Sequence, residues 1–188
     1  MRVVNVHLKS VSPYSPSRYI PERKPPEVSY EEWEIAVWRQ RMHVNDAGMV
    51  YIPAMYLKNT VVEAAKYKDS QICCVSNRMT KAACVDAGIM VTEPVLLPIH
   101  ADAVAYEELH AMGTPKRGCD RRVIRFPLIP AWEGVAEFHI LDDMISNDAF
   151  NAYIADAGQF IGVGRFRPRN SGYYGRFSVE KTEWTTVS

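Results

Sequence analysis

The sequence lacks the features that mark several classes of protein. No apolar run approaches the roughly 20 residues that a membrane-spanning helix needs, and the first ten residues, MRVVNVHLKS, alternate like a strand instead of forming the apolar stretch of a signal peptide. The four cysteines form no CxxC pair, so neither a disulfide framework nor a recognised zinc site is predicted. No Gly-Lys-Ser/Thr sequence occurs, which excludes a Walker-type phosphate loop. We therefore expect a cytoplasmic chain that holds no metal or other cofactor and contacts no membrane.

The chain also lacks net charge, since 22 lysines and arginines balance 22 aspartates and glutamates. Bulk charge therefore predicts no polyanionic partner. The charges are not spread evenly, however: acids gather in 27–34 and 142–156, whereas a basic run occupies 116–125. Because the surface potential follows the local arrangement of charges, a neutral chain of this kind is still able to present a basic face.

The length of 188 residues and the apolar content of 47% suit one domain with a substantial core. Helices are predicted where a cap precedes an apolar stripe: Ser29 and Glu32 form a capping box, Pro53 suits a first helical position, and Ser146 opens a helix that Gly158 would end. The segment 101–112 is also predicted to be a short helix. Strands are predicted at 2–9, at 88–99 with an edge or a break at Pro94, at 123–130, at 135–142 and at 173–184.

Reduced to its strongest elements, the order is strand, helix, strand, strand, helix, strand. This is the split-βαβ, ferredoxin-like plan, an α+β fold with an antiparallel sheet and helices on one face. Residues 1–188 would form this single domain, with inserted loops and helices at about 10–47 and 68–120. RNA-recognition domains share the plan and bind single strands on the open face of the sheet.

The segment FIGVGRFRPRNSGYYGRF, residues 160–177, combines bare backbone, fixed positive charge and flat rings. Glycine lets another backbone or a ligand approach closely, arginine offers a planar fork to phosphate, and aromatic rings stack on unpaired bases. Alternation along RFRPR places the arginines on one side and Phe166 in the interior, and Phe177 is also expected to pack inward. The predicted binding residues here are Gly162, Gly164, Arg165, Arg167, Arg169, Gly172, Tyr173, Tyr174, Gly175 and Arg176. The plainer alternative is a turn with core aromatics.

Two segments resemble those of one family. IGVGRFRPRNSGYYGRF, between the last helix and the last strand, looks like the glycine-rich loop of the RAMP superfamily, the RNA-recognition-fold proteins of CRISPR effector complexes. VYIPAMYLKNTVVEAAK, residues 50–66, is similar to the IPGSSLKGALR pattern of the backbone-subunit group. Ile52, Pro53, Leu57 and Lys58 match it, whereas Ala54 replaces the usual glycine and Glu63 stands where an arginine is common.

The resemblance implies a modified RNA-recognition fold that binds single-stranded RNA along its backbone. It also implies head-to-tail assembly into oligomers or filaments. The departures at Ala54 and Glu63 indicate a divergent member, and the compact length fits a protein encoded by a phage or another mobile element and used on RNA or on single-stranded DNA.

Further cations extend the predicted interface. Lys58 is either a phosphate contact or an exposed helix lysine. The basic run is either a track for a phosphate backbone or a solvated insertion. Its members are Lys116, Arg117, Arg121, Arg122 and Arg125.

Three functions remain open at this point. The leading hypothesis is a non-enzymatic protein that binds single-stranded RNA or DNA and oligomerises on it. The first alternative is a metal-independent endoribonuclease with His43 as general base and Tyr14 or Tyr19 as its partner. The second is a viral or plasmid interaction protein that mimics an effector subunit and docks on a host complex.

Overall fold

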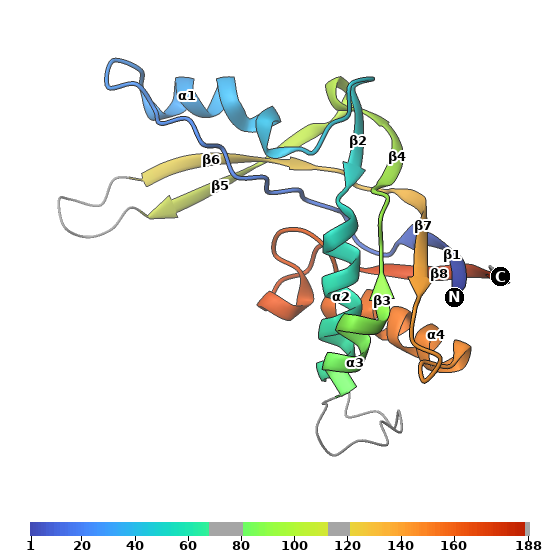
Figure 1. The fold of residues 1–188 in the computed structure, drawn as a ribbon. Helices are drawn as coiled ribbons and strands as arrows, with labels where there is room; N and C mark the ends of the chain where they lie inside the picture. The colour runs from blue at the N-terminus through green and yellow to red at the C-terminus, as the bar shows by residue number, and fades with distance from the viewer. Residues whose placement is uncertain (68–80, 113–120, 187–188) are drawn as a thin grey trace.

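The central sheet has the strand order of the ferredoxin-like plan, which confirms the predicted fold class. The computed structural model describes residues 1–67, 81–112 and 121–186. Four antiparallel strands lie in the spatial order β3-β7-β1-β8 (Figure 1). The first strand of the plan therefore lies between the third and the fourth. The elements of the plan are β1 (Arg2–Ser10), α2 (Ala54–Tyr67), β3 (Ile89–Met90), β7 (Glu133–Ile140), α4 (Asn147–Asp156) and β8 (Phe177–Thr186).

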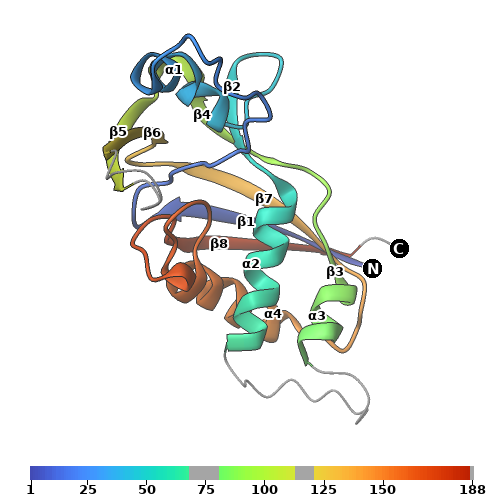
Figure 2. The ribbon, with the colours of Figure 1, turned by 90° about the vertical axis from the view of Figure 1, so that its left-hand side faces the viewer.

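One face of this sheet carries the core. Along β1, Val4, Val6 and Leu8 are buried and alternate with the partly exposed Asn5 and His7, as the period of two in a strand requires. Helices α2 and α4 pack on the buried face (Figure 2). The other face of the sheet remains polar: Asn5 has Glu137 of β7 on one side and Glu183 of β8 on the other.

An arm extends from the sheet. The hairpin of β5 (Ala105–Met112) and β6 (Arg121–Leu128) forms its body, and α1 (Tyr30–Val37), continued by the 3-10 turn Trp38–Arg41, lies along β6 (Figure 1). Ser29 caps α1 through the expected capping box. Strands β2 (Met49–Ile52) and β4 (Val95–His100) pair in a separate two-stranded antiparallel sheet. The chain also forms α3 (Lys81–Gly88) and the 3-10 turn Ala101–Ala103.

A buried ion pair fastens α1 to the hairpin. The Glu34 carboxylate accepts hydrogen bonds from both terminal nitrogens of Arg41, at 2.9 and 3.0 Å, and from the backbone N–H of Arg125 at 3.1 Å. The Arg125 guanidinium is buried in turn and pairs with Glu108 of β5 at 2.8 Å. Since a buried charge is tolerated only when it is paired and hydrogen-bonded, this network fixes the arm as one unit.

Three local predictions need correction or refinement. The predicted helix at 101–112 is wrong, because its residues from Ala105 onward pair in antiparallel register with β6 and become β5. The predicted strand at 88–99 is interrupted at Pro94, where the alternative of a break is confirmed. The helix that begins after Ser146 does not end at Gly158, since its last turn widens into a π turn, Ala157–Ile161.

Removing the Glu34 carboxylate tests the arm. We expect Glu34→Ala to lower the free energy of unfolding by about 3 kcal/mol, because Arg41 and Arg125 then lose a buried acceptor. Urea unfolding followed by circular dichroism measures the change. Glu93→Ala, at an exposed carboxylate, is the control and should stay within about 0.5 kcal/mol of the wild type. Equal stabilities of the two variants would contradict the role of Glu34.

Candidate functional site

Glycines build the loop between α4 and β8. Gly162 ends the π turn with a φ of 73°, and Gly164 and Gly175 have φ values of 81° and 75°. At Gly175 a Cβ would lie 1.8 Å from the carbonyl oxygen of Val163. Because this oxygen belongs to the backbone, no change of side-chain rotamer relieves the clash. These three glycines therefore shape the loop. Residues 160–177 are called the Gly/Arg loop below.

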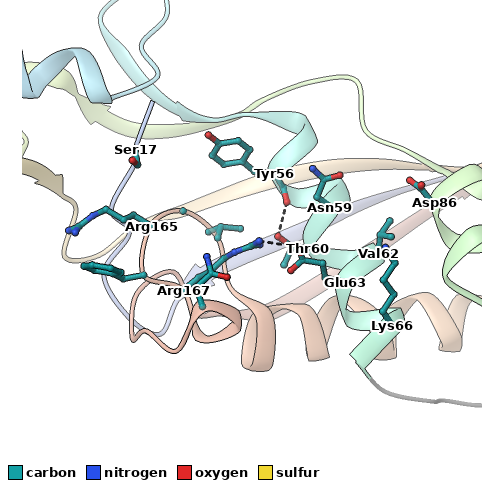
Figure 3. Close-up of a pocket in the computed structure, with 14 residues that line it drawn as sticks. Ser17, Tyr56, Asn59, Thr60, Val62, Glu63, Lys66, Asp86, Arg165 and Arg167 are labelled. Atoms are coloured by element: carbon teal, nitrogen blue, oxygen red, sulfur yellow. Dashed lines mark hydrogen bonds and ion pairs between the residues drawn. The ribbon is translucent and has the colours of Figure 1, made fainter. Parts of the chain in front are cut away.

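A groove of about 680 Å³ separates the Gly/Arg loop from α2 (Figure 3). Two contacts join its walls: Thr60 donates a hydrogen bond to the Gly162 carbonyl at 3.3 Å, and Arg167 pairs with Glu63 at 3.0 Å. The walls therefore come from the two segments that carry the family resemblance. The polar residues along the groove are Ser17, Tyr56, Asn59, Thr60, Glu63, Lys66, Asp86, Arg165, Arg167 and Asn170.

Arg167 lies across the groove from α2. Its side chain is about one-fifth exposed, and Glu63 holds one of its terminal nitrogens. Glu63 occupies the position where the resemblance leads one to expect an arginine. The Glu63 carboxylate neutralises the neighbouring Arg167.

Arg165 lies deeper, with a side chain that is only 8% exposed. Its Nη2 pairs with Glu107 of β5 at 2.9 Å, and its Nε donates to the Ser15 hydroxyl at 3.2 Å. Burial lowers the pKa of this guanidinium, and Glu107 partly offsets the effect. The guanidinium also contacts the ring of Phe126, 3.8 Å from its centroid, and the ring of Phe166 at 4.5 Å.

Phe166 is the residue whose placement was predicted wrongly. It lines the groove and is 48% exposed instead of buried. Its φ is 47°, a left-handed conformation that is unusual for a bulky residue, so the alternation expected of a strand does not apply. Two neighbours hold this backbone: Tyr174 donates its N–H to the Phe166 carbonyl at 2.9 Å, and Gly172 leaves room that a Cβ would fill, 1.9 Å from the same oxygen.

The remaining predicted residues divide between several places. Tyr174 turns toward the arm and donates a hydrogen bond from its hydroxyl to Glu107 at 2.6 Å. Burial raises the pKa of Tyr174, and Glu107 raises it further. Arg176 bonds to the carbonyls of Gln159 and Tyr173. Arg169 and Tyr173 are exposed, and Arg169 has no partner among the described residues. Phe177 packs inward as expected.

The predicted cations outside the Gly/Arg loop are not gathered at the groove. Lys58 pairs with Asp86 of α3 at 3.1 Å. On the arm, the Arg122 guanidinium lies over the ring of Tyr30 at 4.0 Å, and Arg121 begins β6. Lys116 and Arg117 lie outside the described residues. The basic run therefore does not continue the groove in the part of the chain that the structure describes.

His43 has different neighbours from those predicted. Tyr14 is fully buried against Trp132 and Tyr19 is exposed, so neither serves as its partner. The His43 ring instead contacts Tyr51 and Tyr56, with its Nε2 3.4 Å from the Tyr56 hydroxyl. Burial lowers the pKa of His43, and the positive charge of Arg18 adds to the effect.

Several groove residues were missed by the sequence analysis, although one signal for them exists. Tyr56, Asn59, Glu63 and Lys66 recur at helical spacing and form a stripe on α2. This stripe is distinct from the buried positions Leu57, Val61 and Ala64. Among residues 1–67, 81–112 and 121–186, no group of histidines, cysteines and carboxylates is arranged to hold a metal, and no helix is long and apolar enough to cross a bilayer.

The strain at Phe166 is measurable by a pair of substitutions. We expect Phe166→Gly to melt about 3 °C above Phe166→Ala, because glycine adopts a positive φ without cost whereas alanine does not. The control pair Tyr173→Gly and Tyr173→Ala should show the opposite order, since Tyr173 has no positive φ. Differential scanning calorimetry measures all four melting temperatures. The same order in both pairs would contradict the strain.

Comparisons with known proteins give structural likenesses only. No family model matches the sequence, and neither does any curated protein. The crystal structure of Cmr6 from Pyrococcus furiosus is similar with a TM-score of 0.47 and 12% identity, over 94% of this chain and 97% of that one. A chain of a CRISPR RNA-guided surveillance complex is similar with a TM-score of 0.45 and 9% identity, over 99% of this chain and 72% of that one. The second of these belongs to a CRISPR complex, the class that the resemblance in sequence indicated. At these values the likeness concerns the overall fold and nothing about the site.

Proposed function

We propose that this chain binds single-stranded nucleic acid in the groove between α2 and the Gly/Arg loop. One observation carries the proposal: the segments 50–66 and 160–177, far apart in sequence, supply the two facing walls of the groove. The cations Lys66 and Arg167 and the amides of Asn59 and Asn170 offer donors to phosphate and to base edges along it.

Carboxylates on the open face of the sheet occupy several donors of that face. Glu183 pairs with Lys181, and Glu137 pairs with His139. Near the groove, by contrast, the exposed Arg169 lies in the short 3-10 turn Pro168–Asn170, whose last residue lines the wall. A strand leaving the groove on this side would meet an unpaired guanidinium. Assembly of several copies along one strand is part of the proposal.

Binding to labelled oligonucleotides tests the proposal. We expect fluorescence polarisation to show binding of a 20-nucleotide single strand, RNA or DNA, at low salt. Arg167→Ala should weaken it about tenfold and reduce the slope of log K against log salt by about 0.7, because one phosphate contact is lost. Arg23→Ala, at an exposed arginine distant in sequence from both walls, is the matched control and should leave both quantities unchanged. Absence of binding to both RNA and DNA would overturn the proposal and leave the interaction protein as the remaining reading.

The carboxylate of Glu63 should oppose binding. We expect Glu63→Gln to raise the affinity about two- to fivefold, since the amide keeps the shape of the side chain but no longer neutralises Arg167. The double variant Glu63→Gln/Arg167→Ala should lose this gain. An equal gain with and without Arg167 would show that Glu63 acts on the ligand directly and not through the ion pair.

Cleavage of RNA by His43 is a second candidate function, and one observation favours it. His43 contacts Tyr56, a residue of the groove wall, and its lowered pKa favours the neutral imidazole, the form that a general base needs. Incubation of labelled RNA with the wild type and with His43→Ala, in the presence of EDTA, should then give fragments only with the wild type. Intact RNA in both reactions excludes this function.

A further inference from the structure

We infer that Phe166 is the platform on which one unpaired base of the bound strand stacks. The inference rests on the proposed function and deepens it, because it names the chemical group that the groove takes up. Tyr173 and Tyr174 were the residues expected in this role from the sequence. Neither fits it: Tyr174 is hydrogen-bonded to Glu107 and Tyr173 does not line the groove.

The conformation of Phe166 is costly and serves no purpose in the core. A left-handed backbone at a bulky residue costs roughly 1–2 kcal/mol, and such strain persists only where the surroundings impose it. The core gains little from this conformation, because the Phe166 ring stays 48% exposed. Strained residues concentrate at sites of function, and the strain here directs a large aromatic ring into a groove.

The loop holds Phe166 in place before any ligand arrives. On one side of it Arg165 donates its N–H to the Ser15 carbonyl at 2.9 Å, and on the other the Phe166 carbonyl accepts from Tyr174 at 2.9 Å. Gly172 closes the turn against the same carbonyl. The backbone that carries the Phe166 ring is held in this way, so it loses little further freedom when a base binds.

A stack of flat groups already leads to Phe166. The Arg165 guanidinium contacts the rings of both Phe126 and Phe166, at 3.8 and 4.5 Å from their centroids. Of these two rings only Phe166 lines the groove, so its exposed face is the surface that a flat group of a ligand can reach.

A base fits these features better than a protein side chain does. An unpaired base has a flat face that matches the exposed Phe166 ring, and its edge carries acceptors and donors for polar groups of the groove. The groove beside it carries the amides of Asn59 and Asn170, which are able to donate to and accept from a base edge. A duplex offers no free base face, so the inference also limits the ligand to single strands.

Substitutions that keep or remove the ring test the inference. We expect Phe166→Leu, which retains the apolar bulk and the left-handed strain, to bind an ordinary single strand about tenfold more weakly than the wild type. Phe166→Trp should restore the affinity. Against a strand of the same length made of abasic nucleotides, wild type and Phe166→Leu should bind equally weakly. Tyr173→Leu is the matched control and should bind both strands as the wild type does.

Each other outcome has a definite meaning. If the wild type binds no strand, the proposed function and this inference fall together. If the wild type binds and Arg167→Ala weakens it while Phe166→Leu does not, only the inference is overturned. Equal affinity of the wild type for ordinary and abasic strands also overturns it, because the bases then contribute nothing to binding. A strand with 2-aminopurine gives an independent readout, since its fluorescence depends on what the base stacks against and should change differently on binding to the wild type and to Phe166→Leu.

Discussion

The ion pair between Arg165 and Glu107 is the interaction on which the geometry of the site depends. It joins the Gly/Arg loop to the arm, because Glu107 lies on β5, and Ser15 adds the long loop that follows β1. A buried guanidinium left without its carboxylate would cost several kcal/mol, so arm and loop must meet in this one arrangement. The position of the Gly/Arg loop, which forms one wall of the groove, therefore depends on its contact with β5.

Much of the fold follows from local patterns in the sequence. Alternation in β1 and the caps at Ser29 and Ser146 have local causes, and these were predicted correctly. The segment that became β5 was not, since Glu107, Glu108 and Leu109 are good helix formers and only the pairing with β6 makes them a strand. Local propensity holds until a distant partner outweighs it.

The site could be predicted in place but not in detail. The Gly/Arg loop was found from composition, yet Arg165, Arg167 and Arg169 look alike in sequence and differ entirely in the structure: the first is buried, the second is paired across the groove and the third is exposed. The partner of Arg165, Glu107, lies 58 residues away in the sequence, and the partner of Arg167, Glu63, lies 104 residues away. Phe166 was misplaced because a single positive φ reverses the direction that alternation would give.

The internal pairing of these arginines also bears on how fast a ligand would be found. A chain with no net charge, in which Arg165 and Arg167 face their own carboxylates, projects little field from the groove into the solvent. Encounter with a polyanion is then not accelerated by long-range attraction, and association rates should stay in the ordinary range for unsteered partners. Discrimination among ligands would lie in how long each one stays, and hence in the short-range fit of the groove.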